Sequence, residues 1–271
     1  MSDRPPCNCG CANVFGAREA QDDLKRYRRD GAASTTKALI EAIVAEGIQG
    51  ATLLDIGGGI GAIAFELLTA GALRAESVDA TEAYVTVSHE EAERRGLGER
   101  FTGRVGDFVA LAPEIEPADV VTLDKVVCCY ADMPALVERA AERARRTIGL
   151  VFPRETWWNR VAARVLDAWS WLTRDPVRWR LHRPADIDRV LAGAGFERHD
   201  VSRDLIWHVV LYRRSAGELT PGGKGRAPRG PVHKRKSAEL GKGYCGRLAG
   251  QIAGEVTAGT AAAVPRVSSA G

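Results

Sequence analysis

The chain has 271 residues, of which 45% are hydrophobic and 27% are charged, which is the composition of a soluble protein with a sizeable core. No apolar run approaches the roughly 20 residues of a membrane-spanning helix, and the first residues lack the apolar core of a signal peptide, so we expect a cytoplasmic protein. The net charge of +3 conceals an acidic body of net charge −4 and a basic segment, residues 214–271, of net charge +7, and an acidic body disfavours nucleic acid as a partner.

Residues 1–33 are predicted to form an N-terminal arm. Its three cysteines, Cys7, Cys9 and Cys11, fall short of the four ligands of a closed metal site, and no histidine lies near them, so we expect no bound metal. The segment Phe15–Arg29 has apolar residues near one helical face. This pattern predicts a helix that either packs on the surface of the domain or acts as a lid over a ligand site.

Residues 34–213 alternate between strand and helix patterns. The predicted strands lie at the start of 51–69, at 75–80, 101–105, 118–127 and 147–152, with two more within 196–213. The predicted helices are 35–46 with Ser34 as its cap, the end of 51–69, 82–95, 133–146, 154–175 and 184–194. Strands that alternate with helices at this spacing predict a Rossmann-like, doubly wound α/β sheet whose strand-to-helix loops share one edge.

Residues 214–271 differ from the rest of the chain. They are rich in Gly, Ala and basic residues and hold few large apolar side chains, so they cannot bury enough surface to offset the entropy of ordering. We predict a mostly disordered tail whose charges are solvated.

A glycine-rich turn follows the first predicted strand in the sequence ATLLDIGGGIGAIAF, residues 51–65. Gly57, Gly59 and Gly61 allow positive φ angles and the close approach of a ligand to backbone N–H groups at the start of a helix. The spacing matches a dinucleotide fingerprint, so an NAD-dependent oxidoreductase is one alternative. Asp55 would repel a pyrophosphate, however, and suits a ligand with an ammonium and a sulfonium group, such as S-adenosylmethionine.

Acidic residues also end the next two predicted strands. Asp79 can accept hydrogen bonds from both hydroxyls of a ribose, which either cofactor would present. Asp107 offers a carboxylate to an adenine amino group, and Phe108 offers an aromatic ring, although Phe108 can instead belong to the core.

The segments LLDIGGGIG, SVDAT, VGDF and DVVTLDKVV resemble, in this order and spacing, the motifs of the class I S-adenosylmethionine-dependent methyltransferases. The resemblance covers residues 34–213 and implies a seven-stranded sheet with an antiparallel last strand, and S-adenosylmethionine as cofactor. It implies the following contacts: Asp55, Gly57, Gly59 and Gly61 with the methionine moiety, Asp79 with the ribose, Ala80 and Phe108 with the adenine faces, and Asp107 with the adenine amino group.

A looser similarity is to the magnesium-protoporphyrin O-methyltransferases and their bacterial relatives. It lies in Phe15–Arg29, in LDKVVCCY, and in the predicted helix with two adjacent tryptophans that precedes residues 182–196. It implies transfer of a methyl group to oxygen of a small molecule, without implying the porphyrin. A nucleic-acid or protein methyltransferase is the alternative. Enzymes that methylate nucleic-acid amino groups usually carry an Asn/Asp-Pro-Pro-aromatic segment after the fourth strand. Here residues 124–130, DKVVCCY, occupy that place and do not match the segment, which disfavours a nucleic-acid acceptor.

The acceptor pocket is expected beyond the carboxyl ends of the fourth and fifth strands. Tyr130 can orient an acceptor oxygen there, and Lys125 or Arg154 can hold a substrate carboxylate. Trp157 and its neighbour Trp158 cannot both face inward, so one ring is available to a planar ligand.

The remaining candidates near this pocket are weaker. Asp124, at the end of the fourth strand, is counted with the cofactor-binding residues, and His182 is the candidate base. His208, within the last strand, is expected to be structural. Cys128 and Cys129 are expected to be buried small hydrophobic residues rather than nucleophiles.

Overall fold

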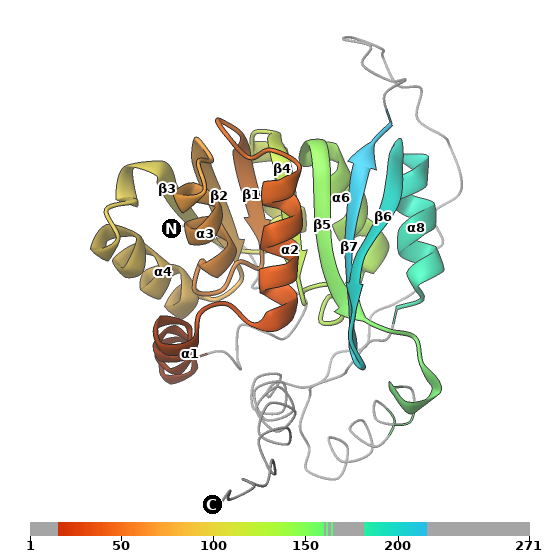
Figure 1. Ribbon diagram of the computed structural model, residues 1–271, viewed down its shortest axis with the longest axis horizontal. Coiled ribbons are helices and arrows are strands. Elements are labelled where there is room, and N and C mark those ends of the chain that lie inside the picture. Colours follow the sequence, from red (N-terminus) through yellow and green to blue (C-terminus); the bar gives the residue numbers. More distant parts are fainter. Residues whose placement is uncertain (1–15, 160, 162–163, 165–181, 216–271) are drawn as a thin grey trace, which may run out of the picture.

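A computed structural model of the protein describes residues 16–159, 161, 164 and 182–215 (Figure 1). The predicted cysteine arm and the basic tail beyond Ser215 lie outside the described residues. So does most of the predicted helix over residues 154–175, of which the structure describes the first turn.

Seven strands form one sheet in the order β3-β2-β1-β4-β5-β7-β6. They are β1 (Thr52–Ile56), β2 (Arg74–Asp79), β3 (Phe101–Val105), β4 (Ala118–Asp124), β5 (Ala144–Pro153), β6 (Phe196–Arg203) and β7 (Trp207–Arg214). The pairs among β1 to β5 are parallel, and β7 is antiparallel to both β5 and β6. This topology confirms the Rossmann-like sheet and its antiparallel last strand.

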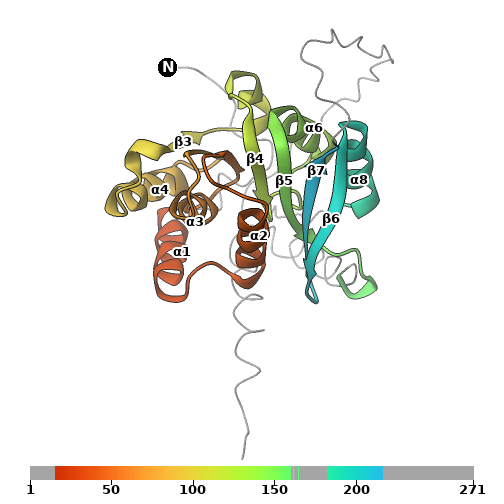
Figure 2. The ribbon, with the colours of Figure 1, turned by 45° about the horizontal axis from the view of Figure 1, so that its top comes forward.

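Helices cover both faces of the sheet (Figure 2). One face carries α1 (Ala17–Asp30), α2 (Ser34–Ala45), α3 (Ala62–Thr69) and α4 (Glu82–Arg94), and the other carries α5 (Phe108–Leu111), α6 (Met133–Arg143) and α8 (Pro184–Gly193). Two short 3-10 turns, η2 (Gly98–Arg100) and η3 (Ala112–Glu114), join elements. Each face buries its own apolar core, as a doubly wound sheet requires.

Three predicted boundaries are wrong, each for a local reason. The N-cap of α2 is Ala33. Ser34 is the first residue of the helix, and its side chain makes no capping hydrogen bond. β4 ends at Asp124 because Lys125 adopts a positive φ of 61°, which turns the chain out of the sheet. β5 begins at Ala144, three residues before the predicted start, because Ala144 is buried and pairs with Ala118 of β4.

The strand order places the carboxyl ends of β1 to β5 at one edge of the sheet, the lower edge in Figure 1. The start of α2 lies at this edge, and α1 packs against α4 beside it. Within the described residues, no helix is both long enough and apolar enough to cross a membrane.

Candidate functional site

The glycine turn after β1 has the conformation that its sequence predicts. Gly57, Gly59 and Gly61 have φ angles of 66°, 54° and 87°, in a region that residues with a Cβ atom rarely adopt. Space is limiting as well, because a Cβ on Gly57 would lie 2.3 Å from Cγ2 of Val126. The loop after β4 therefore packs directly on the backbone of the glycine turn.

Asp55 lies buried beneath this turn, with 1% of its surface exposed. Its Oδ1 accepts a 2.6 Å hydrogen bond from the hydroxyl of Thr122, whereas Oδ2 has no hydrogen-bond partner among the described residues. The pKa of this carboxyl is raised to about 7: burial raises it most, the hydrogen bond from Thr122 lowers it, and the negative charges of Asp124 and Asp79 add to the rise. In the part of the chain that the structure describes, no basic side chain pairs with this carboxyl group.

Asp79 links the end of β2 to the glycine turn. Its Oδ2 accepts a hydrogen bond from the N–H of Gly59 at 3.0 Å, and its Oδ1 accepts one from the N–H of Thr81 at 2.9 Å. Burial raises the pKa of this carboxyl, and the two backbone donors oppose that shift. Ala80, the next residue, is half-buried at the same edge of the sheet.

Asp107 caps the N-terminus of α5. Its Oδ1 accepts from the N–H of Val109 at 3.1 Å and from the hydroxyl of Tyr130 at 2.8 Å. Phe108 is 4% exposed and belongs to the core beneath α5 and α6, so the structure favours the core alternative for this ring over contact with adenine.

Tyr130 joins the loop after β4 to this cap. Burial and the hydrogen bond to Asp107 raise the pKa of its phenol above the ordinary value. Its side chain is therefore a neutral hydrogen-bond donor and not a base. Nε2 of His182 lies 3.3 Å from the backbone oxygen of Tyr130, so Asp107, Tyr130 and His182 come together at one place.

Asp124 and Lys125 form a cluster with a residue that the sequence pattern did not reveal. Thr36, near the start of α2, donates its hydroxyl hydrogen to Oδ2 of Asp124 at 2.5 Å. Nζ of Lys125 donates to Oδ1 of Asp124 at 3.0 Å and to the hydroxyl of Thr36 at 3.2 Å. The ammonium also lies 5.6 Å from the ring centre of Trp207. Two hydrogen bonds and this ring contact therefore hold the ammonium that is expected to bind a substrate carboxylate.

Arg154 faces the turn between β6 and β7. Its guanidinium donates to the carbonyl of Asp204 at 2.7 Å. Trp157 is 71% exposed, and its ring meets that of Trp158 edge-on with 5.5 Å between the ring centres. An exposed aromatic ring thus follows β5, as predicted.

His208 and Cys128 are packed into the domain. His208 is buried and accepts a hydrogen bond from Nε of Arg203 at 2.9 Å. Burial, followed by the charge of Arg198, lowers the pKa of this imidazole. Sγ of Cys128 lies 3.3 Å from the carbonyl oxygen of Lys125 in the loop after β4. Cys128 is buried, whereas Cys129 is partly exposed, so the prediction that both cysteines are buried is wrong for Cys129.

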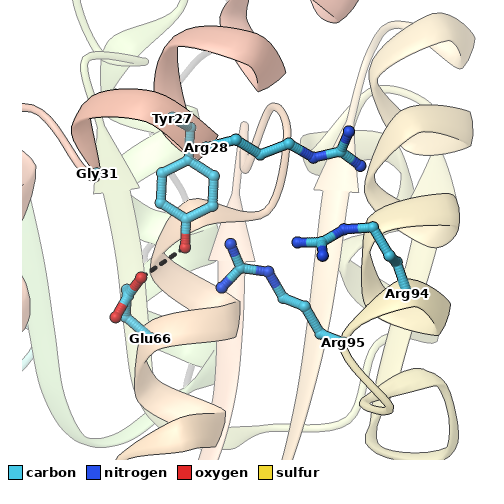
Figure 3. A pocket seen from close by; sticks show the side chains of 6 residues that line it. All are labelled: Tyr27, Arg28, Gly31, Glu66, Arg94 and Arg95. Atoms are coloured by element: carbon cyan, nitrogen blue, oxygen red, sulfur yellow. Dashed lines mark hydrogen bonds between the residues drawn. The ribbon is translucent and has the colours of Figure 1, made fainter.

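A separate pocket of about 370 Å³ lies between α1, α3 and α4 (Figure 3). Its lining residues are Tyr27, Arg28, Gly31, Glu66, Arg94 and Arg95. The hydroxyl of Tyr27 donates to Glu66 at 2.6 Å across it. Because this pocket lies at the last turns of α1 and α4, it is distinct from the glycine turn, which meets the first turn of α4 at Tyr84.

Comparison with known proteins finds solved structures with a similar fold. No protein-family model matches the chain, and no curated protein matches it in sequence. A magnesium protoporphyrin IX methyltransferase from Synechocystis PCC 6803 with bound SAH has a TM-score of 0.58 and 23% identity, over 76% of this chain and 98% of that chain. The chain has the fold of the class I methyltransferases.

Two further solved structures share this fold. The YcgJ protein of Bacillus subtilis has a TM-score of 0.56 and 16% identity, over 67% of this chain and 99% of that chain. An O-methyltransferase family protein from Burkholderia thailandensis has a TM-score of 0.57 and 18% identity, over 76% of this chain and 64% of that chain. At these identities the likeness establishes the fold that the sequence motifs implied, and it leaves the chemistry to be argued from the site.

Proposed function

We propose that the protein transfers a methyl group from S-adenosylmethionine to oxygen of a small-molecule acceptor. One observation carries the choice of cofactor: three carboxylates, those of Asp55, Asp79 and Asp124, gather at the carboxyl ends of β1, β2 and β4. Lys125, the cation beside them in the described structure, is paired with Asp124. Such a site suits a ligand that brings positive charge, and the pyrophosphate of NAD would add charge of the wrong sign.

S-adenosylmethionine, when bound, supplies an electrophilic methyl group on a positively charged sulfur. In this proposal the glycine turn and Asp55 hold the methionine end, with Asp124 close by, and Asp79 holds the ribose. Ala80 lies against the adenine, and Asp107 accepts from its amino group. The fit is supported by the positive φ angles of the turn and by the buried Oδ2 of Asp55, a polar atom without a partner in the described structure.

The acceptor is proposed to be an oxygen that needs little help to ionise. Tyr130 has a raised pKa and donates its one hydroxyl hydrogen to Asp107, so its oxygen can accept a hydrogen bond from a substrate hydroxyl but cannot deprotonate the acceptor. A carboxylate is already ionised at neutral pH and meets this condition. His182 is retained as the base for a phenol or alcohol, with Trp157 as a surface for a planar acceptor and Arg154 at the rim.

Residues 34–213 are proposed to carry the activity in the cytoplasm, with residues 214–271 dispensable for cofactor binding. Two titrations test the proposal, one with S-adenosylhomocysteine and one with NADH, each on the full chain and on a chain that ends at Ser215. We expect both chains to bind S-adenosylhomocysteine with affinities within about threefold, a margin of less than 1 kcal/mol, and neither to bind NADH. The proposal would be overturned if the protein bound NADH and did not bind S-adenosylhomocysteine. Transfer of labelled methyl groups to a panel of carboxylic acids and phenols then tests the acceptor.

A further inference from the structure

Lys125 has an unusual backbone conformation at the edge of the proposed site. Among the described residues it is the one residue other than glycine with a positive φ, 61°. Its N–H still donates to the carbonyl of Val151 in β5 at 3.0 Å, so the turn begins while the residue is attached to the sheet. A long side chain in this conformation persists when its surroundings hold it there, and such residues cluster at functional sites.

The side chain of Lys125 provides that hold. Its ammonium donates to Asp124 at 3.0 Å and to Thr36 at 3.2 Å, and it lies over the ring of Trp207. Thr36 is buried and belongs to α2, whereas Trp207 begins β7. The ammonium thus ties the end of β4 to a helix and a strand that are distant in the sequence.

The turn at Lys125 directs the loop that follows it. Val126 lies against the glycine turn, in the space where a Cβ of Gly57 would be. The hydroxyl of Tyr130, farther along the same loop, reaches Asp107 at 2.8 Å. The loop that begins at this turn therefore carries both the side chain that packs on the glycine turn and the side chain that is proposed to orient the acceptor.

We propose that Lys125 is a positioning residue: its ammonium, held by Thr36 and Asp124, keeps the left-handed turn that sets Val126 against Gly57 and Tyr130 against Asp107. It acts through this loop and not by contact with the substrate. The inference rests on the proposed function for its enzymatic readout. It also makes a claim about the loop that can be measured without any ligand.

Three variants separate the contributions of the ammonium and the backbone. Lys125→Met keeps most of the side-chain stem and removes the charge. Lys125→Gly also removes the charge but adopts a positive φ without strain. Thr36→Val removes the contact from α2 and leaves Lys125 intact. Lys37→Met, at an exposed lysine next to Thr36, is the matched control.

The first readout is amide hydrogen exchange of residues 126–130 in the ligand-free full chain, measured with the thermal midpoint. We expect faster exchange in Lys125→Met and Thr36→Val at a nearly unchanged midpoint, a smaller change in Lys125→Gly, and none in Lys37→Met. Exchange equal to wild type in Lys125→Met and Thr36→Val would overturn the inference. A large fall in the midpoint with exchange increased throughout the domain would also overturn it, because it would indicate a general structural role.

The second readout is the affinity for S-adenosylhomocysteine and the division of the effect between kcat and KM. A displaced loop predicts a roughly tenfold lower kcat in Lys125→Met and Thr36→Val and weaker S-adenosylhomocysteine binding, since misplacement of about 1 Å can cost up to a hundredfold. A rise confined to the KM of the acceptor would instead assign Lys125 to substrate binding and overturn the inference. Failure of wild type to bind S-adenosylhomocysteine would count against the proposed function alone, because the exchange measurement needs no ligand.

Discussion

The hydroxyl of Tyr130 donates to the carboxylate of Asp107 at 2.8 Å, and this contact joins two residues from different strand ends. Asp107 follows β3 and is proposed to bind the adenine amino group. Tyr130 follows β4 and is proposed to orient the acceptor. The same oxygen atom, Oδ1, also accepts from the backbone of Val109, so the cap of α5 and the acceptor loop share one carboxylate. Occupancy of the cofactor site and order of the acceptor loop should therefore be coupled.

A double-mutant cycle measures this coupling. We expect Tyr130→Phe and Asp107→Asn each to weaken S-adenosylhomocysteine binding, and the double variant to be weakened by less than the sum of the two effects. A coupling energy of about 1 kcal/mol is typical of a hydrogen bond between neighbouring side chains. Titration calorimetry on the four proteins gives the value. Strictly additive effects would show that the contact carries no cofactor coupling.

The affinity for S-adenosylmethionine should depend on pH through Asp55. Its carboxyl has a pKa raised to about 7, above all by burial, and a positively charged ligand binds the ionised form better. We therefore expect binding to strengthen as pH rises through about 7, with release of a proton on binding near or below that pH. Calorimetry in buffers of different ionisation enthalpy measures the proton release. Asp55→Asn should bind weakly at all pH values and release no proton, and a proton release equal to wild type in this variant would contradict the assignment.

The same pKa predicts how the ligand-free protein responds to pH. Because the folded protein keeps on Asp55 a proton that the unfolded chain loses near pH 3.8, the free energy of unfolding should fall as pH rises from about 4 to about 7. Asp55→Asn removes the buried charge and keeps the shape of the side chain. We expect this variant to be more stable than wild type at pH 8 by up to a few kcal/mol, in urea titrations without ligand. A loss of stability at pH 8 would contradict the raised pKa.

The sequence was sufficient to predict the sheet and one side of the site, because these depend on local patterns. A glycine cluster between an apolar strand and a helix predicts the turn. Asp79 ends β2 and Asp107 follows β3, and the parallel arrangement of the strands brings their carboxyl ends to one edge of the sheet. The period of the apolar residues therefore indicated where these side chains would lie.

The other side of the site depends on contacts between distant segments, which a single sequence does not reveal. Thr36 and Trp207 meet Lys125 from α2 and β7, and neither lies in a motif. The positive φ of Lys125 has no signal in the sequence, since lysine rarely adopts it. Arg154 directly follows β5, and the hydrogen bond from its guanidinium to the carbonyl of Asp204 in the next turn also has no signal in the sequence.

Gly58 lies beside Asp55 in the glycine turn, and its φ is not positive. A side chain at this position would therefore be opposed by close contacts of its Cβ and not by backbone strain. A Cβ on Gly58 would lie 2.2 Å from the hydroxyl oxygen of Ser77 and 2.8 Å from Oδ2 of Asp55. We expect Gly58→Ala to lower the free energy of unfolding by about 1–3 kcal/mol, the usual cost of overpacking. Adding Ser77→Ala should restore part of this loss, because it removes the nearer atom. Urea unfolding of the two single variants and the double variant tests this, and a double variant as unstable as the sum of the singles would refute it.

Glu91 links α1 to the rest of the domain through an ion pair with Arg28. This carboxylate is fully buried and accepts from three arginines: Arg28 of α1 at 2.6 Å, Arg94 at 2.6 Å and Arg95 at 2.7 Å. These arginines line the pocket between α1, α3 and α4 (Figure 3). Hydrogen bonds from the guanidinium groups, with that of Arg94 foremost, hold the pKa of Glu91 far below its usual range. This contribution to stability is present above about pH 4.5 and is lost as pH falls.

Glu91→Gln removes the charge and leaves three guanidinium groups close together. The arginines are partly exposed and can be solvated, so we expect the variant to lose about 1.5–3 kcal/mol of stability, the usual contribution of hydrogen bonds to a charged group, and to lose it above pH 4.5 rather than in acid. Release of Arg28 should also make α1 a site of early cleavage in limited proteolysis. Glu90→Gln, at an exposed position on the same helix, is the control and should leave both measurements unchanged. Protection of α1 equal to wild type in Glu91→Gln would show that the apolar face of α1, with Ala20 and Leu24 buried, is enough to hold the helix.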